Sequence, residues 1–377
     1  MPVVRRSRST ILCYHGVMKR ATPVYIVQTQ PGFAPIATEE ILATVDATIH
    51  ETYTLPQKND LLFFSTDDDP QLLLALRTAE DLFVEVAHIK DLPLGYSALK
   101  AITEAALRAP GFDTTIGVHR RARPERAGEG KLRFRVVARQ EGQAAYRRVD
   151  GQEALQKGIL LRQDHRWRLD DGGMEYWLTL LPTEALVMLR LSDATMRHRT
   201  YQREHRAASL RPASAAALSW LTEPNDDDTF LDPMCGAGTL VIERANLGRY
   251  AQLIGSDIDM QAVELARANV GTRFQPIAID MWDAADLPLD AGSVSALAVN
   301  LPFGTQFGSR EDNRTLYPAF LAEAARVMRP GAQLVALTGD VRGFTEALRR
   351  QPQFFQRNTW DVQILGHGAR IFRLRHH

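Results

Sequence analysis

The second half of the chain alternates short apolar runs with segments in which apolar residues recur every three or four positions. Strands are predicted at 229–234, 252–259, 275–281, 294–302 and 333–340, and helices at 238–248, 260–271, 315–331 and 343–350. Two more runs, 354–365 and 369–375, surround Gly366 and Gly368 and predict a hairpin. Repeated strand–helix units that end in a hairpin predict a doubly wound, Rossmann-like α/β sheet with a reversed last strand.

The first half shows a different pattern, with strands and helices mixed and no regular strand–helix–strand repeat. Strands are predicted at 22–32, 60–66 and 131–142, two more within 172–192, helices at 34–45 and 151–163, and a helix that runs into a strand at 69–89. Thr38, Glu39 and Glu40 suit the N-terminal end of the helix at 34–45. This order predicts an α+β region.

A change in composition separates the two halves. Residues 193–212 are polar and basic, and an alanine-rich helix is predicted after Pro212. We therefore expect an N-terminal region at 1–192, a linker at 193–212 and a C-terminal domain at 213–377.

Composition restricts the classes of protein that fit. The 377 residues contain no apolar run near the roughly 20 residues that span a bilayer, so no membrane association is expected. Cys13 and Cys235 are the two cysteines, which excludes a disulfide framework and a cysteine-based zinc site. No signal peptide is recognised, no metal is expected, and a reducing cytoplasm is the simplest location.

The net charge of zero conceals a basic segment. Residues 118–168 hold 14 Lys and Arg against 6 Asp and Glu, and the rest of the chain holds 31 against 39. A local excess of positive charge attracts a polyanion even when the whole chain is neutral. Charge alone leaves nucleic-acid binding and a solvated basic surface equally open.

A glycine-rich loop follows the first strand of the C-terminal domain. The loop DPMCGAGT begins at Asp232 and includes Cys235, Gly236, Ala237 and Gly238. Glycines at this place let a ligand approach the backbone closely, and the absence of a following Gly-Lys-Ser/Thr excludes a phosphate-binding P-loop. The acid at the strand end suits a cationic ligand group better than a pyrophosphate. Cys235 is expected to pack rather than to act as a nucleophile.

Two more strands of this domain end in acids. Asp257, followed by Ile258, stands 25 residues after Asp232, a spacing at which such folds place a carboxylate on ribose hydroxyls. Asp280 and Met281 end the third strand, where they suit an adenine amino group and ring. Acids at the carboxyl ends of consecutive parallel strands predict a shared nucleoside-type site.

The fourth strand ends in Asn300, Leu301, Pro302, Phe303 and Gly304. An exocyclic amine on a nucleobase is a poor nucleophile, because its lone pair is delocalised into the ring. The amide oxygen of Asn300 and the carbonyl of Leu301 are suited to accept its N–H hydrogens and orient the nitrogen. Phe303 is suited to stack on a flipped base. These residues predict direct methyl transfer to an amino group.

With these motifs the chain resembles the THUMP-domain class I RNA guanine-N2 methyltransferases. DPMCGAGT and NLPFG are similar to the cofactor and target loops of that family. The segment from His205 to Leu210 is similar to the part that leads into the methyltransferase domain and helps to cover the cofactor. Phe33-Ala34 replaces a common Leu-Glu of the family, and Leu301 stands where many relatives have a second proline.

The resemblance implies a ferredoxin-like element and a THUMP domain at 1–192, S-adenosyl-L-methionine as the cofactor, and tRNA as the partner. Cofactor contacts are then expected from His205, Leu210, Asp232, Cys235, Gly236, Ala237, Gly238, Asp257, Ile258, Asp280, Met281 and Asn300. Candidate RNA contacts are Arg120, Arg121, Arg123, Arg126, Arg133 and Arg135. A monomer is expected. The alternatives are guanine-N2 methylation of 23S rRNA and a non-catalytic RNA-binding protein of the same fold. The short spacing from Gly238 to Asp257 favours the tRNA enzymes.

Overall fold

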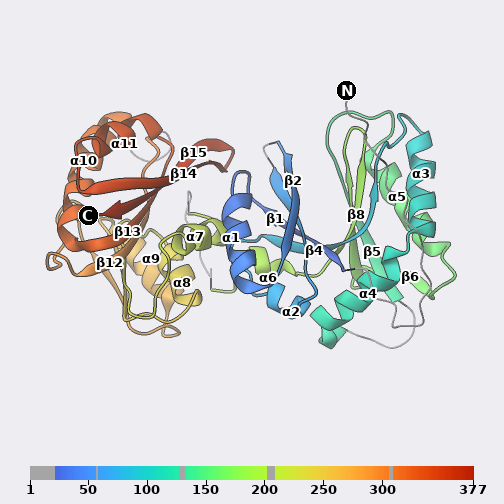
Figure 1. The fold of residues 1–377 in the computed structure, drawn as a ribbon, viewed down its shortest axis with the longest axis horizontal. Helices are drawn as coiled ribbons and strands as arrows, with labels where there is room; N and C mark the ends of the chain where they lie inside the picture. The colour runs from blue at the N-terminus through green and yellow to red at the C-terminus, as the bar shows by residue number, and fades with distance from the viewer. Residues whose placement is uncertain (1–21, 57, 127–131, 202–208, 305–308) are drawn as a thin grey trace, which may run out of the picture.

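The chain folds around two β-sheets that lie side by side along the longest axis of the molecule (Figure 1). A computed structural model describes residues 22–56, 58–126, 132–201, 209–304 and 309–377. The first sheet has eight strands in the order β2-β3-β1-β4-β8-β7-β5-β6, and the second has seven in the order β11-β10-β9-β12-β13-β15-β14. None of the described helices is long and apolar enough to cross a membrane.

The eight-stranded sheet forms the N-terminal α+β region. Its strands are β1 (Val24–Thr29), β2 (Thr48–Leu55), β3 (Asn59–Ser65), β4 (Asp81–Ile89), β5 (Leu132–Gln140), β6 (Trp167–Leu169), β7 (Met174–Leu180) and β8 (Ala185–Arg190). Its helices are α1 (Ala34–Thr44), α2 (Pro70–Leu73), α3 (Ser97–Arg108), α4 (Gly111–Ala122) and α5 (Arg148–Leu160). The sheet pairs β1 with β3 and β4 in antiparallel register, and β5 with β7 in parallel register.

Three sequence-based expectations for this region were wrong or incomplete. Helix α1 begins at Ala34, so Glu40 does not stand at its N-terminal end; the Glu40 carboxylate is buried and accepts from the backbone N–H groups of Arg77 and Thr78. The helix expected after residue 69 is the four-residue α2. The amphipathic helices α3 and α4 were not predicted, and they cover the sheet beside α5.

The seven-stranded sheet has the predicted doubly wound order. Its strands are β9 (Thr229–Asp232), β10 (Gln252–Asp257), β11 (Ile277–Met281), β12 (Val294–Asn300), β13 (Met328–Thr338), β14 (Phe354–Ile364) and β15 (His367–His376). Its helices are α7 (Pro212–Trp220), α8 (Thr239–Asn246), α9 (Met260–Val270), α10 (Arg310–Val327) and α11 (Val341–Leu348). Strands β9 to β13 run parallel, and β15 is antiparallel to β13, which confirms the reversed strand.

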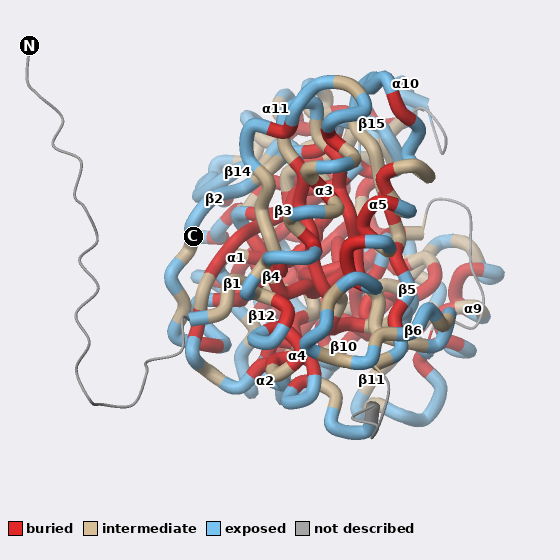
Figure 2. The backbone as a smooth tube through the Cα atoms, turned by 90° about the vertical axis from the view of Figure 1, so that its right-hand side faces the viewer, coloured by how far each residue is buried: buried red, intermediate tan, exposed pale blue. Residues whose placement is uncertain are grey.

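Helix α10 differs from its predicted limits at both ends. It begins at Arg310 because Ser309 and Asp312 form a reciprocal capping box, and it ends at Val327 rather than at Pro330-Gly331. The Pro-Gly pair lies in the first part of β13. The central strands of both sheets are buried, as the red tube inside the molecule shows in Figure 2, whereas β2 and much of β14 are exposed.

Helix α1 and the turn before it join the two sheets. Phe33 and Ile36 belong to the same buried cluster as residues of α7, α8 and β13. In Figure 1 the hairpin of β14 and β15 reaches toward α1 and β2. The Gln363 N–H donates to the Pro31 carbonyl at 3.0 Å, and a Cβ on Gly32 would lie 2.2 Å from the Asp361 carbonyl oxygen. The hairpin backbone therefore needs a glycine beneath it.

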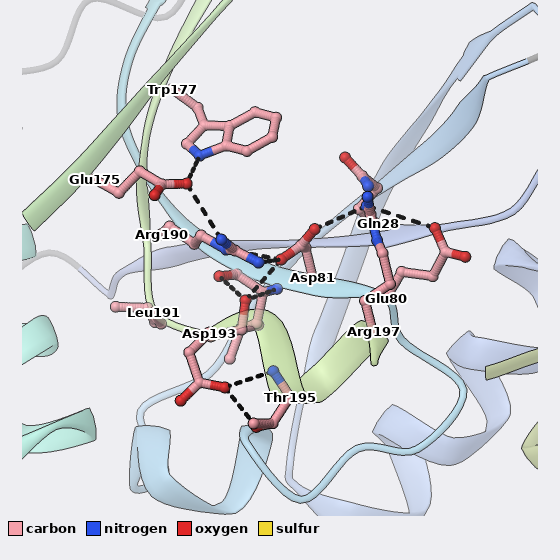
Figure 3. Close-up of polar contacts among 12 residues, drawn as sticks. Gln28, Glu80, Asp81, Glu175, Trp177, Arg190, Leu191, Asp193, Thr195 and Arg197 are labelled. Carbon is pink, nitrogen blue, oxygen red and sulfur yellow. Dashed lines mark hydrogen bonds and ion pairs between the residues drawn. The ribbon is translucent and has the colours of Figure 1, made fainter. Parts of the chain in front are cut away.

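A chain of ion pairs joins strands of the first sheet to helix α6 (Ala194–Arg197), which follows that sheet in the chain (Figure 3). Arg190 bridges Glu175 and Asp81, and Arg197 of α6 reaches Asp81 at 2.9 Å. Arg211, directly before α7, donates to Glu80 at 2.9 Å. The acids at the start of β4 thus hold residues of the predicted linker. The predicted boundaries at 193 and 212 remain predictions.

Candidate active site

A cavity of about 420 Å³ opens at the carboxyl ends of β9, β10 and β12. In open α/β sheets, ligands bind at this edge, where the strand order reverses. The predicted site residues that line it are Leu210, Asp232, Cys235, Gly236, Ala237, Asp257, Ile258, Asn300, Leu301, Pro302 and Phe303. The structure therefore brings most of the predicted cofactor and target residues into one cavity. His205 lies outside the described residues.

The glycine-rich loop between β9 and α8 is shaped by left-handed backbone. Gly236 has φ of 52° and Gly238 has φ of 78°, conformations that favour glycine. Asp257 Oδ2 accepts from the Gly236 N–H at 2.9 Å, and the Cys235 N–H donates to the Ser256 carbonyl at 2.8 Å. Burial raises the pKa of the Cys235 thiol well above its ordinary value. A buried thiol of raised pKa is a poor nucleophile.

Asp232 is a buried carboxylate with no cationic partner among the residues that the structure describes. Its Oδ1 accepts from the Met234 N–H at 3.3 Å, and its Oδ2 has no hydrogen-bond partner within the part of the chain that the structure describes. Burial raises the pKa of Asp232 well above its ordinary value, and the nearby Asp257 raises it further. A cationic ligand group would supply the missing hydrogen-bond donor and favour the ionised carboxylate.

The third predicted acid, Asp280, lies outside the cavity. The Asp280 carboxylate is held by Arg267 of α9 at 2.8 Å, and neither Asp280, Met281 nor Gly238 lines the cavity. Asp283, two residues after β11, lines the cavity instead and was not singled out from the sequence. Ile258 is 71% exposed, so its side chain offers apolar surface at the cavity wall.

Asn300 ends β12, which lies between β9, the strand that ends in Asp232, and β13. Its amide oxygen is buried and has no hydrogen-bond partner among the described residues. The next residue is fixed by a hydrogen bond from the Leu301 N–H to the Leu337 carbonyl at 2.9 Å. The Pro302 carbonyl accepts from the Tyr317 hydroxyl at 2.5 Å and from the Asn313 amide at 3.3 Å. The Pro302 carbonyl is thus engaged within the protein, whereas the Asn300 oxygen is available to a ligand N–H.

Phe303 lines the cavity and lies against Gly339, the residue that follows β13. A Cβ added to Gly339 would stand 2.6 Å from Cδ2 of the Phe303 ring. The ring thus occupies space that only a glycine leaves open. Gly304, with φ of 68°, follows it and turns the chain away from the strand.

The sequence predicted the hairpin of β14 and β15 but did not assign its turn to the site. Ile364, Leu365 and His367 line the cavity together with Leu316 of α10. They lie far from the glycine-rich loop in the chain, and the antiparallel pairing of β15 with β13 brings them beside it. Leu365 has φ of 50°, which a sequence pattern does not reveal.

The arginines predicted to contact RNA differ in their exposure to solvent. Arg120 and Arg121 are exposed at the end of α4, and Arg133 and Arg135 are exposed on β5 beside Asp170 and Glu175. Arg123 is directed inward, where it donates to the Leu191 carbonyl at 2.9 Å and pairs with Asp193 at 3.2 Å. The side chain of Arg126 lies outside the described residues.

Comparison with known proteins agrees with this geometry. Residues 199–368 match a family described as "RMKL-like, methyltransferase domain". The chain is 31% identical over 317 residues to a tRNA (guanine(6)-N2)-methyltransferase of Thermus thermophilus, a match that covers 80% of this chain and 85% of that protein. It is 32% identical over 232 residues to the tRNA (guanine(6)-N(2))-methyltransferase THUMP3 of Mus musculus, covering 57% and 46%.

The fold extends the similarity over nearly the whole chain. The crystal structure of TrmN from Thermus thermophilus superposes with a TM-score of 0.73 at 24% identity, covering 94% of this chain and 100% of that one. The chain spans about half of the length of the mammalian relatives, 46% of the mouse protein and 53% of the Bos taurus one.

Proposed function

We propose that this chain, which belongs to the family of THUMP-containing tRNA guanine-N2 methyltransferases, methylates the exocyclic N2 amine of the guanine at position 6 of tRNA. The observation that carries the proposal is the match to the Thermus thermophilus enzyme, because it covers 80% of this chain and 85% of that protein. A second relative of the same name, from Methanocaldococcus jannaschii, is 23% identical over 93% of this chain.

The cavity fits S-adenosyl-L-methionine. The unpartnered oxygen of the buried Asp232 suits the ammonium group of the methionine end, and Asp257, at the end of β10, suits the ribose hydroxyls. Ile258 offers apolar surface to the adenine ring. His205, Asp280 and Met281 keep their predicted cofactor contacts as part of this proposal. When bound, the cofactor supplies an electrophilic methyl group on a sulfonium.

Asn300 prepares the guanine amine for this methyl group. Its buried amide oxygen accepts one N–H of the amine and fixes the direction of the nitrogen lone pair. The Leu301 carbonyl accepts the second N–H. Transfer of the methyl group from the bound cofactor to this amine would release one proton, which water would accept. Phe303 packs on the purine.

The N-terminal region supplies the RNA contacts. The exposed arginines of α4 and β5 give the chain a positive surface for phosphates, and Arg126 belongs to the same basic segment. A tRNA substrate, a monomer and a cytoplasmic location complete the proposal.

The test is methyl transfer from labelled cofactor to tRNA and rRNA, followed by nucleoside analysis. We expect N2-methylguanosine in tRNA that carries guanine at position 6, and no label in the same tRNA with adenine at that position. Label confined to rRNA or to U6 snRNA, the substrate in the name of a 26% identical relative of Bos taurus, would contradict the proposal.

The substitution Asn300→Ala tests the role of the amide. It should abolish turnover and largely retain cofactor binding, whereas loss of that binding would instead assign Asn300 to the cofactor.

A further inference from the structure

The turn at the end of the C-terminal hairpin holds a leucine in a backbone conformation that leucine disfavours. Ile364 of β14 pairs with His367 of β15, so Leu365 and Gly366 alone form the turn. Their φ values are 50° and 82°. Positive φ at both central positions is the signature of a type I′ turn, for which Asn-Gly is strongly preferred. Turn formation therefore does not account for a branched apolar residue at 365.

Packing of the protein core does not account for it either. Leu365 remains 52% exposed, whereas its neighbour Ile364 is 8% exposed and belongs to the buried cluster of the C-terminal domain. The exposed leucine nevertheless lines the same cavity as Asn300 and Phe303. Disfavoured backbone conformations of this kind persist where the side chain serves a site.

The cavity lining changes from acidic to apolar along the sheet. Asp232 and Asp257 come from β9 and β10, and Asn300 comes from the neighbouring β12. The sheet continues on that side through β13 to β15 and β14, whose turn adds Leu365. Leu365, Phe303 and Leu316 thus give apolar surface beyond Asn300, on the side away from the two acids. The face of a purine ring is the part of the proposed reaction that needs such surface.

The turn is fixed from outside the C-terminal domain. Gln363, two residues before Leu365, donates its N–H to the Pro31 carbonyl of the N-terminal region at 3.0 Å. The Gly32 N–H donates in turn to Asp60 Oδ2 at 2.7 Å. These bonds hold the hairpin end, so the position of Leu365 over the cavity is set by the fold.

We propose that Leu365 packs against the target nucleobase and, together with Phe303, holds the base so that its amino group meets Asn300. The inference rests on the proposed methyl transfer to a nucleobase. It adds a positioning residue from an element that neither the sequence motifs nor the family comparison assigns.

The substitution Leu365→Asn separates this role from a structural one. It creates the favoured Asn-Gly turn, so the melting temperature of the protein should rise. It also removes the apolar contact, so kcat/KM for tRNA should fall about tenfold or more, while affinity for S-adenosyl-L-methionine stays unchanged. The substitution Leu365→Met keeps an apolar side chain at this position, so this variant should retain most of the wild-type kcat/KM.

Asp91→Asn is the matched control, because Asp91 is exposed and has φ of 55° in a loop of the N-terminal region. It should leave kcat/KM unchanged. A Leu365→Asn variant with unchanged kcat/KM, or one that loses stability and activity together, would overturn the inference. Nucleoside analysis of the same reactions tests the guanine assignment separately: label in adenosine would contradict the proposed function, whereas the ratio of variant to wild-type rates would still report on the contact.

Discussion

The Arg77 Nε donates to Glu243 Oε2 at 2.7 Å, and this pair joins the N-terminal region to helix α8 of the C-terminal domain. The Glu243 carboxylate is fully buried. It also accepts from the Tyr201 hydroxyl at 2.5 Å and lies 3.8 Å from Arg199. Since α8 begins at the end of the glycine-rich loop, the network fixes the N-terminal region to the element that carries the predicted cofactor loop.

Glu243→Gln should lower the free energy of unfolding by about 3 kcal/mol, because it takes the hydrogen-bonded counter-charge from the partly buried Arg77 guanidinium. Urea denaturation measures the change. The exposed Glu346, which pairs with Arg342 at 2.9 Å, is the control, and Glu346→Gln should cost at most about 0.5 kcal/mol. A loss below about 1 kcal/mol for Glu243→Gln would show that the network does not hold the two parts together.

Asp232→Asn should stabilise the ligand-free protein near neutral pH and weaken cofactor binding. Burial raises the pKa of Asp232, so the folded protein binds this proton more tightly than the unfolded chain does. Such a carboxyl opposes folding as pH rises above the ordinary value of about 4, and it has no such effect below that value. The melting-temperature gain of the variant should therefore disappear at acidic pH.

Two measurements check this prediction. Thermal unfolding of wild type and variant should give curves that meet below about pH 4 and separate above it. Titration with S-adenosyl-L-methionine should show weaker binding by the variant, because the ammonium group loses its anionic partner. A variant that is less stable than the wild type at pH 7 would assign Asp232 to the support of the fold.

The sequence allowed the seven-stranded sheet and much of the cavity to be predicted, because both follow from local rules. Apolar runs mark the buried parallel strands, and Asp232, Asp257 and Asn300 each follow such a run. Parallel strands present their carboxyl ends at one edge, so residues distant in the chain are expected to converge there.

Other features depend on contacts between segments that no local pattern reports. The sequence correctly predicted that β11 ends at Met281. The pairing of Asp280 with Arg267, however, depends on how α9 packs on that strand. Likewise, Glu40 was predicted to suit the N-terminal end of the helix at 34–45. It is instead the seventh residue of α1, and its buried carboxylate accepts from the Thr78 hydroxyl of a distant segment.

The arginines of the basic segment should separate into two classes when they are replaced. Arg120→Ala and Arg133→Ala should each weaken tRNA binding and reduce its dependence on salt, because both side chains are exposed. Arg123→Ala should chiefly destabilise the fold, since it removes the hydrogen bond to the Leu191 carbonyl. Filter binding at several salt concentrations measures the first effect and thermal unfolding the second.

The exposed Arg349, at the end of α11, provides the control for charge alone. Arg349→Ala removes one positive charge from the other end of the chain and should leave the salt dependence of tRNA binding as it is. Equal losses for Arg120→Ala and Arg349→Ala would show that binding follows total charge rather than the basic segment.

Gly339→Ala, directly after β13, should impair turnover because the new side chain would displace the Phe303 ring. The new Cβ would lie 2.6 Å from Phe303 Cδ2, so the ring must move within the cavity that it lines. We expect kcat/KM for tRNA to fall about tenfold or more, with cofactor affinity retained, since Asp232 and Asp257 come from other strands. Gly117→Ala, where the nearest atom to a new Cβ is 4.0 Å away in helix α4, is the matched control and should leave kcat/KM unchanged. Steady-state kinetics and cofactor titration of both variants test the prediction, and unimpaired turnover by Gly339→Ala would remove Phe303 from the target site.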